Sequence, residues 1–82
     1  MMAIPVRIIN NIEKKVKEHQ SLTGATKTFL ANQMGITPAR LYQVMKSDNM
    51  MLDVIVRIAL ILNCKIDDLI EYETIVQDKW QI

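Results

Sequence analysis

The sequence predicts an all-α domain of five helices followed by a short C-terminal tail. Glycine and proline each occur only twice among the 82 residues, so few positions favour the turns that join strands. Half of the residues are hydrophobic, which is ample for a packed core. Leu, Ile, Met and Lys are abundant, and these residues are well tolerated in helices.

The first helix is expected over roughly residues 4–20. Ile4, Ile8, Ile12 and Val16 recur every four residues and would share one helical face. Pro5 is compatible with the first turn, because the first amides of a helix have no partner within it.

The second and third helices are expected to be joined by a tight turn. The second would begin near Lys27 after the N-cap Thr26 and end at Gly35, since glycine accepts the left-handed conformation that follows a helix end. Thr37 would cap the third helix, with Pro38 at its first position. The inner faces of the two helices are expected to hold Phe29, Leu30, Met34, Leu41, Val44 and Met45.

A fourth helix is predicted over about residues 51–62, stopped by Asn63, and a short fifth helix over about residues 66–71. The chain shows no repeat, low-complexity stretch or interdomain linker. We therefore expect one domain over residues 1–72, containing a two-helix motif at 27–46, and a tail over residues 73–82.

The fourth helix is apolar on almost every side, and a helix of that kind must be covered all round. One small domain covers a single side, which leaves Val56 and Leu60 for another partner. The tail residues Ile75, Val76 and Trp80 could cover them, as could the first helix or a second copy of the chain. We expect a homodimer through this surface and the tail; cover by the tail of the same chain is the alternative.

Charge is divided unevenly along the chain, although the net charge is only +1. Residues 1–46 hold seven Lys and Arg but two Asp and Glu, whereas residues 47–82 hold three and seven. Such a split is typical of a protein with one face for an anionic partner, with ordinary solvated surface as the alternative.

Several functional classes have no support in the residues. Cys64 is the only cysteine and His19 the only histidine, so neither has partners for a disulfide or a zinc site. There is no nucleophile–base pair and no phosphate-binding glycine loop, so we expect neither an enzyme nor a metal or other cofactor. The apolar run 54–62 is too short to span a bilayer, no signal peptide is recognised, and we expect a cytoplasmic protein.

The motif at 27–46 has the residues needed to lock two helices together. Ala31 is small enough for a close helix crossing, Ile36 fills the gap at the turn, and Leu41 holds the third helix down. A helix held in this way can present its free face to the DNA major groove. That face is expected to hold Pro38, Ala39, Arg40, Tyr42 and Gln43.

The chemistry of the free face suits base recognition. Gln43 can make a bidentate contact to adenine, Arg40 can reach guanine or a phosphate, and Ala39 and Pro38 can touch a thymine methyl group. Residues 21–46 contain three cations and no acid, as binding to phosphates requires. Phosphate contacts are expected from Lys27, Thr28, Thr37 and Lys46.

Residues 26–37, Thr-Lys-Thr-Phe-Leu-Ala-Asn-Gln-Met-Gly-Ile-Thr, resemble the second helix and turn of Cro/CI-type (XRE-like) helix-turn-helix domains. Residues 52–62 and 63–72 resemble their fourth and fifth helices, especially in the small single-domain subfamily. The resemblance implies a five-helix, lambda-repressor-like domain that binds an operator, usually as a dimer.

The sequence departs from the family pattern at several positions. Met45 stands where Glu is usual, Ser47 where Gly is usual, and Met51 where a Ser or Thr usually caps the fourth helix. Pro38 and Ala39 have short side chains for base contacts. The other three residues of the free face would therefore carry most of any sequence specificity.

The leading hypothesis is a sequence-specific transcriptional regulator, a repressor that binds a pseudo-palindromic operator in double-stranded DNA as a homodimer. The alternative is an antitoxin-like or antirepressor module that uses the same fold to bind a protein partner, as a large exposed apolar surface would favour. Neither hypothesis involves a membrane.

Overall fold

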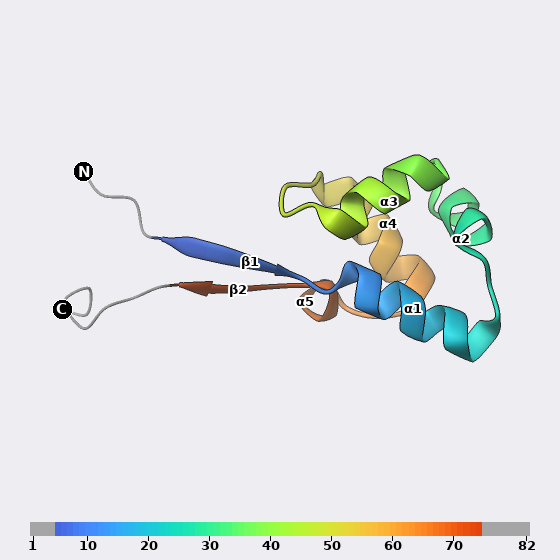
Figure 1. The fold of residues 1–82 in the computed structure, drawn as a ribbon, viewed down its shortest axis with the longest axis horizontal. Coiled ribbons are helices and arrows are strands. Elements are labelled where there is room, and N and C mark those ends of the chain that lie inside the picture. The colour runs from blue at the N-terminus through green and yellow to red at the C-terminus, as the bar shows by residue number, and fades with distance from the viewer. Residues whose placement is uncertain (1–4, 75–82) are drawn as a thin grey trace.

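The computed structural model describes residues 5–74, in which five helices are flanked by two strands. In chain order these are β1 (Val6–Asn10), α1 (Ile12–Thr23), α2 (Lys27–Met34), α3 (Pro38–Lys46), α4 (Leu52–Leu62), α5 (Ile66–Leu69) and β2 (Ile70–Thr74). The helices form one body, and the two strands form a ribbon that projects from it (Figure 1).

The core of the helical body is formed by apolar side chains from all five helices. Among the described residues no polar or charged side chain is buried, so hydrophobic burial dominates the stabilisation of this core. Its members are Ile12, Val16, Leu30, Ala31, Met34, Leu41, Val44, Met45, Val54, Ile58, Ala59, Leu62 and Leu69.

The predicted boundaries of α2 and α3 are confirmed, and so are their caps. The side-chain oxygen of Thr26 accepts a hydrogen bond from the backbone N–H of Phe29 at 3.1 Å. Thr37 does the same for Arg40 at 3.1 Å. Gly35 ends α2 in the left-handed conformation, with φ 76°. These three residues set the angle at which the chain turns from α2 into α3.

Phe29 was expected in the core, and that prediction is wrong: 52% of the residue is exposed. The buried residues of α2 are Leu30, Ala31 and Met34. These positions form one side of a helix with 3.6 residues per turn, and residue 29 lies outside that side.

The expected first helix over residues 4–20 is wrong in its N-terminal part, where β1 replaces it; α1 begins at Ile12. A spacing of four residues is one helical turn and also two strand periods, so it fits both structures. Val6, Ile8 and Ile9 are β-branched, which favours the strand. The strand also depends on a partner far along the sequence, because β1 pairs with β2.

The fold is therefore mostly helical with a small antiparallel sheet, and the all-α prediction is incomplete. The fifth helix was expected to reach residue 71 but ends at Leu69, where β2 follows. The expected border between domain and tail, at residues 72 and 73, falls within β2. The predicted interface residues Ile75, Val76 and Trp80 lie outside the described residues.

One side of α4 is buried and the other carries an exposed apolar stripe. Val54, Ile58, Ala59 and Leu62 lie in the core. The residues of the stripe, one turn apart, are Leu52, Val56 and Leu60. The exposure of Val56 and Leu60 that the sequence indicated is thus present in the single chain.

Candidate nucleic-acid interface

The helix α3 is attached to the body by one side and exposed on the other. Leu41, Val44 and Met45 are buried. Pro38, Ala39, Tyr42, Gln43 and Lys46 are exposed. Residues 39, 42, 43 and 46 follow one another at helical spacing, so they share a single face that a nucleic acid can approach.

Arg40 lies at the edge of this face, where it is half-buried. Its backbone N–H is held by the cap at Thr37. Within residues 5–74 its guanidinium takes part in no ion pair, so its charge remains available to an anionic ligand. Four of the five predicted base-contacting residues are thus fully on the open face, and the fifth borders it.

The predicted phosphate-contacting residues lie at helix ends. Lys27 and Thr28 occupy the first turn of α2 and are exposed. Thr37 caps α3; its oxygen accepts the bond from Arg40, which leaves its hydroxyl hydrogen free to donate. Lys46 is the last residue of α3. Positive helix N-termini and the two lysines together suit anions at both ends of α3.

Lys46 already has a partner, which the sequence did not reveal. Its Nζ lies 2.7 Å from Oε2 of Glu13 on α1 and 5.9 Å from the ring centroid of Tyr42. The hydrogen bond from Lys46 lowers the pKa of the Glu13 carboxyl, and the same bond raises the pKa of Lys46. A phosphate that binds Lys46 must therefore compete with Glu13.

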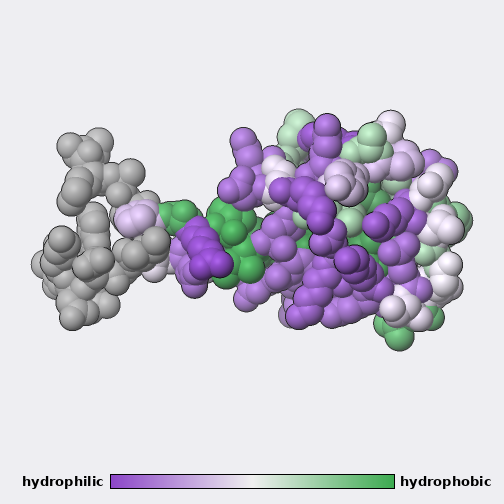
Figure 2. All heavy atoms as spheres, viewed as in Figure 1, coloured by the Kyte–Doolittle hydropathy of each residue, from purple (hydrophilic) through white to green (hydrophobic). Residues whose placement is uncertain are grey.

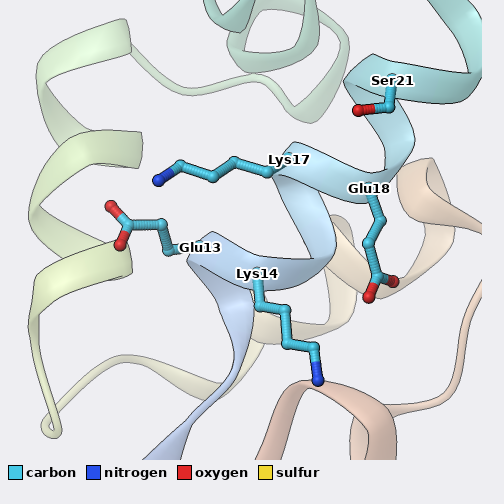
Figure 3. Close-up of a pocket in the computed structure, with 5 residues that line it drawn as sticks. All are labelled: Glu13, Lys14, Lys17, Glu18 and Ser21. Carbon is cyan, nitrogen blue, oxygen red and sulfur yellow. The ribbon is translucent and has the colours of Figure 1, made fainter.

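Two further cations act on the same carboxylate. Lys17 and Lys27 also lower the pKa of Glu13 by their charge. Figure 3 shows Glu13 and Lys17 extending from α1 toward α3, while Lys14 points away. We call Lys17, Lys27 and Lys46, which come from three helices, the basic cluster. Lys17 was not among the predicted residues, because the sequence does not show which side of α1 faces α3.

The turn between α2 and α3 is supported from α4. Nη1 of Arg57 donates a hydrogen bond to the carbonyl oxygen of Met34 at 3.3 Å, and Nε of Arg57 lies 3.8 Å from Oδ2 of Asp53. The guanidinium thus satisfies a carbonyl at the end of α2, one that has no partner within the helix.

A single amide joins the C-terminal end of α3 to the ribbon. Nδ2 of Asn10 donates to the carbonyl oxygen of Val44 at 2.8 Å and to that of Ser47. Its Oδ1 accepts from the backbone N–H of Ile12, the first residue of α1, at 2.9 Å. Asn10 therefore fixes the direction of the ribbon relative to α3. Sequence reasoning missed this residue, since the two carbonyls that its amide binds lie more than thirty positions away.

Two short helices joined by a glycine turn, with the second exposed on one face, define a helix-turn-helix DNA-binding domain. The family model of the Cro/C1-type HTH DNA-binding domain matches residues 16–74, and the chain belongs to this family. The match confirms the resemblance found in the sequence and makes the chain a DNA-binding regulator. No curated protein matches the chain.

Among the helices within residues 5–74, none has the length and apolarity needed to cross a membrane.

Proposed function

We propose that the chain is a sequence-specific transcriptional repressor that binds a pseudo-palindromic operator as a homodimer. The observation that supports this most is the open face of α3, which is pinned to the core behind and bordered by cations. In this proposal α3 enters the major groove. Bases are contacted by Pro38, Ala39, Arg40, Tyr42 and Gln43, and phosphates by Lys17, Lys27, Thr28, Thr37 and Lys46.

A homodimer would match the two-fold symmetry of the proposed operator. Two α3 helices related by a two-fold axis would read half-sites about 34 Å apart, one turn of DNA. Two surfaces of the chain could support the dimer: the exposed stripe of α4, and the ribbon together with the tail at residues 73–82.

The test is selection of bound genomic fragments followed by sequencing. We expect an enriched inverted repeat whose half-sites lie about one helical turn apart. Binding without any common sequence would leave the family assignment intact but contradict the proposed operator.

Removing either of two long polar side chains that are proposed to contact bases should weaken operator binding. Gln43→Ala and Arg40→Ala are each expected to cost about 1–3 kcal/mol of specific binding, because each leaves a base edge without its partner. The measurement is titration of the selected operator and of a scrambled duplex at fixed salt. Arg7→Ala is the charge control for Arg40→Ala, since it removes an equal charge from the ribbon. If both variants bind like the parent, the assignment of base readout is wrong.

Removing the acid that competes for Lys46 should strengthen non-specific DNA binding. In Glu13→Gln the lysine is free to neutralise one more phosphate, so affinity rises and the plot of log K against log salt steepens by about 0.9. Because Lys46 lowers the pKa of Glu13, the carboxylate stays charged at neutral pH. At that pH the negative charge is removed by substituting the residue.

Glu18→Gln is the matched control for this experiment. Glu18 pairs with Lys15 on its own helix at 3.4 Å, and Figure 3 shows it pointing away from Glu13. An equal rise in affinity for both variants would mean that only net charge matters, not the position of Glu13 beside Lys46.

The exposed stripe of α4 favours a second candidate, an antitoxin-like or antirepressor module that binds another protein. That function predicts a stoichiometric protein partner and no retention of any genomic DNA fragment at low salt.

A further inference from the structure

The stripe of α4 is a continuous apolar row on the surface of the helical body. Leu52 is 68%, Val56 38% and Leu60 73% exposed, and the N-cap Met51 before them is 62% exposed. The three helical residues are four positions apart, so their side chains follow one another along the helix. The surface over α1 and α3, by contrast, is largely hydrophilic (Figure 2). A contiguous apolar row of this kind marks a surface for a partner.

One edge of the stripe carries an acid and a base. With 3.6 residues per turn, Asp53 and Arg57 lie on the same side of α4, next to the stripe. Nε of Arg57 lies 3.8 Å from Oδ2 of Asp53, and more than half of each side chain is exposed. This loose pair leaves both groups open to a partner of opposite charge, so the stripe presents an apolar row with one charge of each sign along its border.

This pattern is complementary to itself. In a two-fold interface the same patch meets its own copy, and two α4 helices would then run antiparallel. If the axis passes beside Ile55, Asp53 lies level with Arg57 of the second copy, and Arg57 lies level with its Asp53. The same axis makes the stripe side chains of the two copies alternate along the contact at steps of about 3 Å. One placement of the axis therefore satisfies both the charges and the apolar packing.

The stripe is too small to hold two free chains together. Its three side chains and Met51 expose about 450 Å² per copy, against about 800 Å² per partner in a stable interface. A contact of that size belongs to the weak, transient class. Two copies held at neighbouring sites on one DNA molecule are at an effective concentration on the order of millimolar, at which a weak contact forms.

We propose that the stripe of α4 joins copies of the chain bound at neighbouring DNA sites, antiparallel about a two-fold axis beside Ile55, so that the sites are filled cooperatively. The stripe shares no residue with the open face of α3, so both surfaces can be occupied together. The inference rests on the proposed binding of α3 to DNA. It assigns the stripe to contacts between operator-bound units, not to the dimer within one unit.

The test compares duplexes that carry one or two copies of a site taken from the selected genomic fragments, with the spacing varied over one helical turn. At the favoured spacing we expect the parent chain to fill the second site about tenfold more tightly than the first. The double variant Val56→Gln with Leu60→Gln should lose this gain and keep its affinity for one site. Circular dichroism checks its helical content.

Two single variants make the test specific to the proposed contact. Asp53→Lys should also abolish the gain, because it turns both attractions between Asp53 and Arg57 across the interface into repulsions. Leu22→Gln is the matched control: this leucine of α1 is 86% exposed and lies outside the stripe, so the gain should persist.

Three outcomes would overturn the proposal. The first is the absence of any gain at every spacing, and the second is a gain that survives in the double variant, which would leave the stripe to a different protein. The third is a stable dimer without DNA, measured by sedimentation equilibrium, that dissociates in the double variant, because the stripe would then be the interface within one operator-bound unit. Single-site binding without a gain contradicts this inference alone. A parent chain that binds no single site contradicts the proposed role of α3, and the inference with it.

Discussion

Replacing Asn10 with alanine is expected to lower the free energy of unfolding by about 2–3 kcal/mol. The change removes two donated hydrogen bonds and one accepted bond, each worth about 0.5–1.5 kcal/mol. It leaves the carbonyls of Val44 and Ser47 without the amide in a half-buried position. Urea unfolding followed by circular dichroism measures the effect.

The neighbouring asparagine is a matched control. Asn11 donates to Glu71 at 2.6 Å at an exposed site, so Asn11→Ala should cost well under 1 kcal/mol. Asn10→Asp keeps the bond from the backbone N–H of Ile12 but turns a charged oxygen toward the two carbonyls, so it should cost more than Asn10→Ala. Equal stability of the Asp variant and the parent would show that the amide donor is not what joins the ribbon to α3.

Gly35→Ala is expected to cost about 2 kcal/mol. At φ 76° a side chain is strained by about 1–2 kcal/mol. The added carbon would also lie 2.7 Å from Nη1 of Arg57, which must move and give up its bond to Met34. Because that bond supports the turn before α3, DNA affinity should fall along with stability.

Gly24→Ala separates the cost of the strained backbone from the cost of displacing Arg57. Gly24 has a similar φ of 73°, but a carbon added there meets no atom within 4 Å. The excess cost at Gly35 over Gly24 is therefore the contribution of Arg57. In an Arg57→Ala background this excess should vanish, and a double-mutant cycle measures the coupling. An unchanged excess would mean that Arg57 does not restrict residue 35.

The elements predicted most accurately from the sequence are those whose ends are defined by local chemistry. Thr26, Gly35, Thr37 and Asn63 each mark a boundary that the structure confirms, because a cap or a left-handed residue acts within a few positions. The strands were missed since their stability comes from pairing between distant segments. The β-branched residues of β1 favour a strand, but the four-residue spacing of its apolar residues fits a helix as well.

The same distinction applies to the site. The open face of α3 could be predicted from helical spacing, as the residues lie on one short segment. The partners that govern that face could not: Glu13 for Lys46, Arg57 for the turn, and Asn10 for the end of α3. Each comes from an element whose orientation toward α3 is set by tertiary packing.

The pairing of β1 with β2 has a consequence for how the protein is made. Sixty positions separate Asn10 from Ile70, which lie opposite each other at the base of the ribbon. On a ribosome the first strand emerges long before the second, so the helical body can form while β1 still waits for its partner. A chain interrupted before residue 70 could expose a formed α3 yet have no ribbon.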